Sequence, residues 1–157
     1  MKKILIATDG SAPSIEALEF GLDLAAEEDA DTIVVHVIPS IDSVPSGGFG
    51  MSHGAIVHEV TPDDMEPLET AVELAAAKGL AVTTELLRGS TVHEIAAYAD
   101  AQDVDLIVVG SRGHGALTTA LLGSVSLGVL RHSVRPVLIV RGHAARPLET
   151  ARAPALA

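Results

Sequence analysis

The sequence predicts an α/β domain: a doubly wound, five-stranded parallel sheet of strand order 3-2-1-4-5 with helices on both faces, as in Rossmann-like folds. Three observations predict this class. Short, continuously apolar runs are typical of strands that are buried on both faces. Helical patterns separate these runs, so that strands and helices alternate along the chain. The 157 residues, 48% of them hydrophobic, suffice for one domain with a substantial core.

The chain begins with a pattern of strand, helix and strand. The apolar run Ile4–Ala7 predicts the first strand. Ser11 is a suitable N-cap and Pro13 is acceptable in a first helical turn. Apolar residues then recur at helical spacing over residues 15–24 and predict the first helix. A second buried strand is expected over Thr32–Ile38.

The middle of the chain contains a long connection, a helix and a third strand. Residues 40–61 are rich in Gly, Ser and Pro, and we interpret them as a long mobile loop. Residues 63–78 predict a helix whose acidic first turn suits the helix dipole, with Gly79 as its C-cap. Residues 80–89 alternate in their middle and predict the third strand.

The third helix and the fourth strand follow directly. Either Ser90 or Thr91 is expected to cap a helix that runs through residue 102, and Thr91 with Glu94 has capping-box spacing. The apolar run 104–110 then predicts the fourth strand.

The last elements are a short helix and a short strand. We expect the helix from about residue 124 to 132 and the fifth strand over Val137–Arg141. Residues 143–157 have no apolar period and are expected to form a disordered tail. The predicted domain therefore spans residues 1–142.

Composition excludes several classes of function. A net charge of −11 disfavours general binding to nucleic acid or to anionic membranes. A small anionic ligand remains compatible with it, because backbone N–H groups can hold phosphate. The absence of cysteine excludes disulfides, thiol catalysis and Cys-based metal sites. No apolar run approaches a membrane span of roughly 20 residues, and the first one is too short for a secretory signal, so we expect a soluble, cytoplasmic protein.

Polar and glycine residues follow the predicted strands where a ligand site is expected. In open parallel sheets, ligands bind beyond the carboxyl ends of the strands, near the switch in strand order. Asp9, Val37 and Gly110 lie at those ends. The Asp9 carboxylate can accept hydrogen bonds from ribose hydroxyls, and Gly110 allows the backbone to pass close to a sugar.

The segment VVGSRGHGALTTALLGSVS, residues 108–126, follows the fourth strand. It contains no lysine and matches neither the phosphate-loop pattern nor the dinucleotide fingerprint. Gly113 and Gly115 permit backbone conformations that aim successive N–H groups at an anion. Gly123 and Ser124 open a helix whose free N–H groups favour phosphate. The alternative is that these glycines only shape a loop.

The spacing Gly-x2-Gly-x9-Gly-Ser resembles the nucleotide-binding signature of the universal stress protein family. The resemblance extends to KILIATDGS, VVHVIP and VDLIVVGSRGHG…LLGSVS…VLRHSVRPVLIVR, and covers roughly residues 2–141. In the ATP-binding members of that family, the residue matching Asp9 holds ribose and the backbone of the residue matching Val37 reads adenine. The signature amides and its serine hold the phosphates. The resemblance therefore implies ATP as the ligand, with any Mg²⁺ carried by the phosphates.

Charged and histidine side chains near the segment have open roles. Arg112 and His114 each either contact the ligand or remain solvated loop groups. His36 is expected to face the core from its strand, and the histidines show no metal-binding pattern, so we predict no metal site built from protein ligands. The predicted nucleotide-binding residues are Ala7, Asp9, Val37, Gly110, Arg112, Gly113, His114, Gly115, Gly123, Ser124, Val125 and Ser126.

The chemistry of the segment favours binding over catalysis. Fast phosphoryl transfer needs cations on the γ-phosphate and a placed base, and we find neither a lysine nor a clear base there. The sequence favours a nucleotide-binding regulatory module with slow or no hydrolysis. The alternatives are a weak ATPase and a partner-binding structural member without nucleotide. ATP is not distinguished from other adenine nucleotides such as cyclic AMP.

The last strand predicts a partner. Val137–Arg141 is apolar, lies at the end of the sheet order and would present an exposed edge. Pairing with the same strand of a second copy would cover that edge, and the family resemblance implies such a homodimer.

Overall fold

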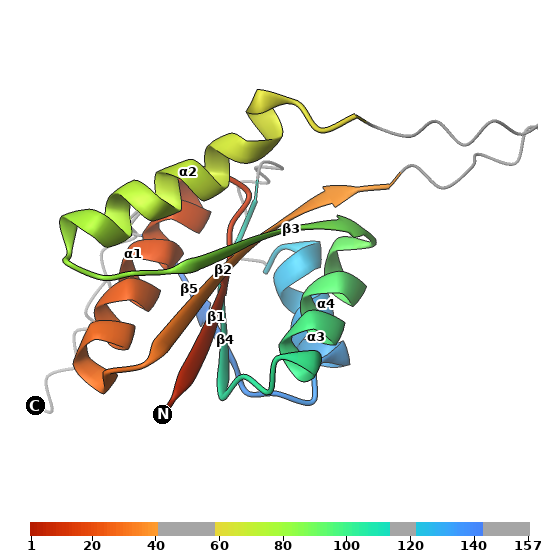
Figure 1. The fold of residues 1–157 in the computed structure, drawn as a ribbon. Helices are drawn as coiled ribbons and strands as arrows, with labels where there is room; N and C mark the ends of the chain where they lie inside the picture. The colour runs from red at the N-terminus through yellow and green to blue at the C-terminus, as the bar shows by residue number, and fades with distance from the viewer. Residues whose placement is uncertain (41–58, 114–121, 143–157) are drawn as a thin grey trace, which may run out of the picture.

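The computed structural model describes residues 1–40, 59–113 and 122–142, and its elements alternate along the chain as expected (Figure 1). All strand pairs are parallel, and the strand order is β3-β2-β1-β4-β5. The predicted doubly wound sheet is therefore confirmed. The elements are β1 (Lys3–Ala7), α1 (Ala12–Glu28), β2 (Asp31–Pro39), α2 (Pro62–Ala77), β3 (Thr83–Gly89), α3 (Thr91–Ala101), β4 (Leu106–Gly110), α4 (Ser124–His132) and β5 (Val137–Val140).

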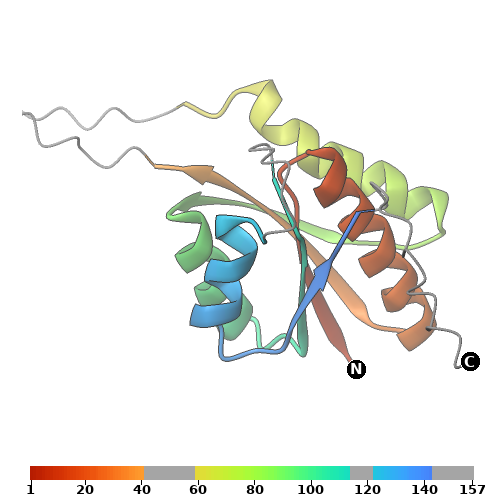
Figure 2. The same ribbon diagram turned by 180° about the vertical axis from the view of Figure 1, so that it is seen from behind.

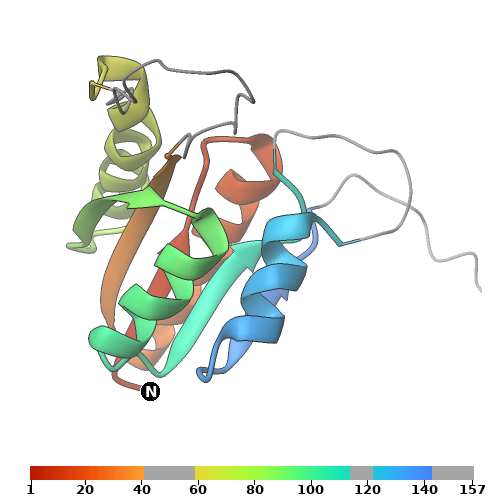
Figure 3. The same cartoon turned by 90° about the vertical axis from the view of Figure 1, so that its right-hand side faces the viewer.

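Helices cover both faces of the sheet. α1 and α2 lie on one face, and α3 and α4 lie side by side on the other (Figures 1 and 3). α1 packs on β1 and β4, whereas α2 packs on β2 and β3. Seen from behind, β5 forms one edge of the sheet, and β3 forms the other edge (Figure 2). Because the strands are parallel, all their carboxyl ends lie along the same edge of the structure.

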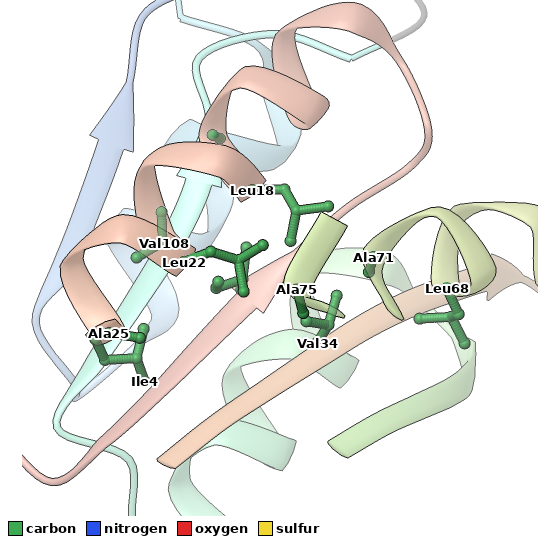
Figure 4. Close-up of a cluster of buried hydrophobic side chains, with 11 residues drawn as sticks. Ile4, Leu18, Leu22, Ala25, Val34, Leu68, Ala71, Ala75 and Val108 are labelled. Carbon is green, nitrogen blue, oxygen red and sulfur yellow. The ribbon is translucent and has the colours of Figure 1, made fainter. Parts of the chain in front are cut away.

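The core consists of two apolar clusters, one on each face of the sheet. Ile4 and Ile6 of β1 belong to the cluster beneath α1 and α2, whereas Leu5 between them belongs to the cluster beneath α3. In the first cluster, Leu22 of α1 and Val34 of β2 pack with Ile4 (Figure 4). Burial on both faces explains why the strands are continuously apolar in sequence rather than alternating.

The bounds of two elements differ from those predicted. α1 begins at Ala12, directly after the predicted N-cap Ser11, but it continues to Glu28, beyond the apolar pattern over residues 15–24. β3 begins at Thr83 rather than at residue 80. The reason is that Leu80 still closes the preceding helix, because its N–H donates to the carbonyl of Ala75. The remaining bounds agree closely with the predictions.

The capping box lies in a different helix from the one predicted. Thr91 is already the first residue of α3, and Ser90 is its N-cap. The box forms instead at the start of α2, where the Asp64 carboxylate accepts hydrogen bonds from the Thr61 N–H at 2.7 Å and from the Thr61 hydroxyl at 2.8 Å. An aspartate at the third helical position thus fulfils the role usually given to Glu or Gln.

Two predictions concern segments outside the described residues. The predicted mobile loop meets the described ranges only at residue 40 and residues 59–61, and the predicted tail, 143–157, lies wholly beyond them. Within the described part of the chain, no helix has both the length and the apolar character that crossing a membrane requires.

Candidate functional site

A cavity of about 530 Å³ lies at the carboxyl ends of β1, β2 and β4. The edge of the sheet is stepped there, because β1 ends at Ala7 while the neighbouring β2 continues to Pro39. Thr91 and Ser124, the first residues of α3 and α4, complete the wall. The volume lies in the range of small-molecule sites, roughly 300–1,000 Å³. The position is the one that the switch in strand order predicts.

Every predicted site residue within the described ranges lines this cavity. The fold brings them together from the ends of three strands and from the start of α4. His114 and Gly115 lie outside the described residues. The predicted residues that line the cavity are Ala7, Asp9, Val37, Gly110, Arg112, Gly113, Gly123, Ser124, Val125 and Ser126.

Asp9 stands in a tight turn between β1 and α1. Its Oδ1 accepts hydrogen bonds from the N–H of Ser11 at 3.0 Å and from the Ser11 hydroxyl. Gly10 adopts a φ of 76°, a left-handed conformation that few other residues adopt without strain. These contacts direct the half-buried carboxylate toward the cavity wall at Gly113.

Gly113 is required by the close approach of Asp9. A Cβ on Gly113 would lie 2.5 Å from Asp9 Oδ2, a distance that real Cβ atoms essentially never show. Gly113 is not among the described residues with positive φ. The sequence predicts a special backbone conformation for this glycine, whereas in the structure its missing side chain makes room for the Asp9 carboxylate.

Gly110 is also explained by contact, but with the protein itself. A Cβ on Gly110 would lie 2.9 Å from the Pro13 carbonyl oxygen and 3.2 Å from the Arg112 carbonyl oxygen. The predicted reason for this glycine was space for a sugar. In the structure, its missing side chain allows the end of β4 to pack directly on the first turn of α1.

The start of α4 presents backbone donors to the cavity. Gly123 is the N-cap, and its own N–H donates to the Ser111 carbonyl at 2.7 Å. The first turn of this helix carries no acidic side chain, which leaves the positive end of the helix dipole without a counter-charge from that turn. Ser124 and Val125 are exposed there. The arrangement suits a bound anion.

Ser126 differs from Ser124 in a way that the sequence did not reveal. Ser126 is only 2% exposed, and its hydroxyl donates to the Gly123 carbonyl at 2.9 Å and lies 3.3 Å from the Ser111 carbonyl. The Ser126 hydroxyl therefore holds the N-cap in place. The exposed Ser124 is the better placed of the two to meet a ligand.

Val37 offers its backbone to the cavity. The Val35 carbonyl accepts from the Thr8 N–H at 2.9 Å, so Val35 directs its backbone polar groups toward β1. Because successive strand residues direct these groups to opposite sides, Val37 again directs its own toward the β1 side, beyond the last residue of β1. One donor and one acceptor on the same residue can recognise the edge of a flat polar ring.

Part of the lining was not predicted from the sequence, above all His36. This residue was expected to face the core, but it is half-buried and lines the cavity, with its Nδ1 2.8 Å from the Thr8 carbonyl. Its place beside Val37 at the end of β2 was the available signal. The other lining residues outside the prediction are Thr8, Ser14, Val35, Pro39, Asp63, Pro67, Thr91, Ile95 and Val109.

The cavity combines an apolar floor with a polar end. Ile95 and Val109 lie with Val37 among the buried residues on the α3 face of the sheet. The described lining carries the charged groups Asp9, Asp63 and Arg112, and no lysine. Within the described ranges, no group of three or more His, Cys, Asp or Glu side chains is arranged to hold a metal ion. This set of groups can bind a flat ring and an anion.

The sequence also matches a known family model. The match is to the universal stress protein family, and it covers residues 1–141.

The chain belongs to the universal stress protein family.

Relatives with known names agree with this assignment. The chain is 39% identical to the universal stress protein YxiE of Bacillus subtilis over 145 residues, which cover 88% of this chain and 98% of the relative. It is 33% identical to the universal stress protein MJ0531 of Methanocaldococcus jannaschii, with 89% and 82% of the two chains covered. The relatives are therefore similar over nearly their whole length.

Solved structures share the universal stress protein fold. A universal stress protein crystallised in complex with cAMP has a TM-score of 0.66 and 26% identity, with 88% of this chain and 95% of that chain covered. The protein MJ0577 has a TM-score of 0.70 and 24% identity, with 92% and 98% covered. The second similarity concerns the fold alone.

Proposed function

We propose that this universal stress protein binds an adenine nucleotide, ATP in particular, in the cavity described above, and that it acts as a regulatory module in the stress response. The observation that carries the proposal is the convergence of Asp9, Val37 and the start of α4 on one cavity. Each of them offers the kind of group that one part of a nucleotide requires. A second support is that a structural relative binds cAMP, which is also an adenine nucleotide.

The apolar floor suits the base. Adenine is a flat ring with a donor and an acceptor on one edge, and the Val37 backbone offers one of each toward the β1 side. Ile95 and Val109 provide apolar surface for the faces of such a ring. Asp9, anchored by Ser11, would accept hydrogen bonds from the ribose hydroxyls.

The start of α4 suits the phosphates. The N–H groups of its first turn, the exposed Ser124 hydroxyl and the helix dipole all favour negative charge. Arg112 also lines the cavity and adds a permanent positive charge. Any Mg²⁺ would be held by phosphates and water and would neutralise part of the phosphate charge.

The proposal is tested by identifying the nucleotide that co-purifies with the protein and by titration calorimetry with ATP, AMP and cAMP. We expect an adenine nucleotide in the purified protein and tighter binding of ATP than of the other two. Asp9→Ala should weaken ATP binding by about tenfold to 100-fold, because it removes a charged acceptor. Unchanged affinity in a folded Asp9→Ala protein would exclude the ribose role of Asp9.

Hydrolysis is proposed to be slow or absent. The described lining has a single permanently cationic side chain, Arg112, and no lysine to stabilise charge on the γ-phosphate. Release of phosphate over many turnovers, lost in Ser124→Ala, would instead establish a weak ATPase.

We further propose a homodimer formed through β5. This strand is an edge of the sheet, and all four of its residues are half-buried and apolar. The exposed apolar residues Val134, at 80% exposure, and Leu130 lie just before it in sequence. Pairing with a second copy would cover the edge and bury this surface.

The hydrogen-bond pattern of β5 provides a specific test of the dimer. The carbonyl of Pro136 accepts from Ile107 of β4, and the carbonyl of Val140 accepts from Ser111, the residue after β4. Successive strand residues direct their backbone groups to opposite sides, so Ile139, next to Val140, directs its N–H to the open edge. Among backbone hydrogen-bonding groups, Ile139→Pro removes only that outward donor, and an edge strand tolerates proline at such a position. Because Ile139 also packs against the core on the α3 face, Ile139→Ala is the control for the loss of its side chain. We expect light scattering to show a dimer for the wild type at micromolar concentration and a monomer for the variant. A wild-type monomer would contradict the proposal.

Two further expectations from the sequence stay proposals. We propose that residues 1–142 form one nucleotide-binding unit and that the protein acts in the cytoplasm, without nucleic acid or membrane as a partner. Fractionation of the cell, with the protein detected by antibody, would test its location.

A further inference from the structure

We propose that His36 is a positioning residue for Asp9, and that it sets how strongly the site prefers a nucleotide with ribose hydroxyls. This inference rests on the proposed binding of an adenine nucleotide. It starts from a cavity-lining histidine to which neither the family signature nor the sequence analysis assigned any role in the site.

The proton on His36 is assigned by its partner. His36 Nδ1 lies 2.8 Å from the Thr8 carbonyl oxygen, and a carbonyl can only accept. Nδ1 must therefore carry a hydrogen and donate it. An imidazole that gains a second proton keeps this one, so the hydrogen bond to Thr8 survives in either charge state.

The hydrogen bond acts on the peptide that leads into Asp9. The carbonyl of the Thr8–Asp9 peptide is hydrogen-bonded to His36. The N–H of the same peptide, which belongs to Asp9, lies 3.3 Å from the Ser14 hydroxyl. Both polar ends of this one peptide are thus fixed by side chains. Because a peptide is planar, fixing both ends fixes the plane and with it the position of the Asp9 Cα, from which the side chain extends. The hydrogen bonds from Ser11 to Oδ1 then set the direction of the side chain.

The surroundings make this plane rigid. Thr8 and Ser14 are almost fully buried, and their hydroxyl oxygens lie 3.1 Å apart. The Thr8 hydroxyl also accepts from the Gly10 N–H at 3.2 Å, and the Ser14 hydroxyl donates to the Ser11 carbonyl at 2.9 Å. Within this network, His36 is the member contributed by β2.

The direction of Asp9 is critical because little space surrounds its carboxylate. Oδ2 lies so close to Gly113 that even a Cβ there would collide with it, while Oδ1 is engaged by Ser11. A small rotation of the Thr8–Asp9 peptide would therefore misplace the acceptor of the ribose hydroxyls. Small displacements of a positioned group can cost much of its contribution to binding.

The test measures how strongly each protein prefers ATP over 2′,3′-dideoxy-ATP, which lacks both hydroxyls. His36→Phe keeps the volume of the ring and loses the donor, and we expect it to lower the preference by about threefold to tenfold. His36→Asn places an amide N–H near the position of Nδ1 and should retain most of the preference. His36→Ala replaces His36→Phe if the latter does not fold.

The matched control is His132→Phe. His132 Nδ1 also pairs with a backbone carbonyl, that of Gly128 at 2.9 Å, but it lies at the last turn of α4 and does not line the cavity. This variant should keep the wild-type preference.

A double-mutant cycle separates a positioning role from a direct contact. If His36 acts through Asp9, then His36→Phe has no further effect on the preference once Asp9→Ala is present. A further loss in that background would overturn the proposal, and so would a wild-type preference in folded His36→Phe. Failure of the wild type to bind any adenine nucleotide would overturn the proposed function and, with it, this inference.

The ligand-free protein provides an independent readout. Heteronuclear NMR at a pH where the imidazole is neutral should show His36 as the Nδ1–H tautomer. An Nε2–H tautomer would be incompatible with donation to Thr8 and would overturn the proposal even if nucleotide binding behaved as expected.

Discussion

The two segments that form the site, the turn after β1 and the segment after β4, position their groups by opposite means. The first holds one side chain, the Asp9 carboxylate, through hydrogen bonds from Ser11 and through the fixed peptide before it. The second offers backbone, and at Gly110 and Gly113 a Cβ would collide with another part of the molecule. One segment depends on polar side chains that are present, and the other depends on side chains that are absent.

Because of this difference, the two segments should respond differently to mutation. In the turn, loss of a hydrogen-bonding partner should affect ligand binding more than folding, because Asp9 is only half-buried. In the glycine segment, an added methyl group should affect folding or binding according to the atom that it meets.

Gly110→Ala should have the largest effect, and it should act on stability. The new Cβ meets only backbone atoms, the nearest at 2.9 Å in Pro13, and backbone cannot move aside cheaply. We expect a loss of about 1–3 kcal/mol in the free energy of unfolding, measured by denaturant titration.

Gly21→Ala is the matched control for that variant. Its Cβ would lie 2.7 Å from Ile6 Cδ1 and 3.0 Å from Ile6 Cγ1, which are side-chain rather than backbone atoms, and alanine is the better helix former. The loss of stability should be clearly smaller than in Gly110→Ala. Equal losses would show that the change in stability does not depend on whether the added Cβ meets backbone or side-chain atoms.

Gly113→Ala should chiefly reduce nucleotide affinity, because its Cβ would displace the Asp9 carboxylate rather than backbone. We expect ATP to bind about tenfold more weakly in calorimetry, with little change in the thermal midpoint. In the Asp9→Ala background, the same substitution should cost nothing further. A full tenfold loss in that background would mean that Gly113 acts on the ligand directly.

Asp105→Asn should have the smallest effect. Like Asp9, Asp105 has a carboxylate that accepts hydrogen bonds from backbone N–H groups. Asp105 Oδ2 accepts from the N–H groups of Lys2 at 2.7 Å and Lys3 at 2.9 Å, and these hydrogen bonds hold the pKa of Asp105 below its ordinary value. A lowered pKa means that the stabilisation is present above the unfolded value, near pH 4, and is lost as pH falls through the folded value.

The measurement for Asp105→Asn is thermal unfolding as a function of pH. At neutral pH the wild type should unfold at a slightly higher temperature than the variant, and the gap should close in acid. The effect should be small, because Asp105 is exposed to solvent. A difference in unfolding temperature that does not change with pH would mean that the charge of the Asp105 carboxylate is not the source of the stabilisation.

Where a local rule applied, the residues picked from the sequence line the cavity. Asp9 directly follows a buried strand, and the glycines stand at fixed spacing before a helix, so the topology of a parallel sheet sufficed to place them at one edge. His36 was misplaced because strand periodicity says which face a side chain takes. It does not say that the neighbouring strand, β1, ends early and leaves that face open.

The element order, the parallel sheet and the family resemblance could be predicted from the sequence, because apolar periodicity and short motifs are local properties of the chain. Three features became visible in the folded structure alone: the close contacts at Gly110 and Gly113, the role of the Ser126 hydroxyl at the helix cap, and the hydrogen bond from His36 to the peptide before Asp9. The physical reason is that each of these depends on a distance between segments far apart in the sequence. Such distances are set by the packing of the whole sheet and its helices.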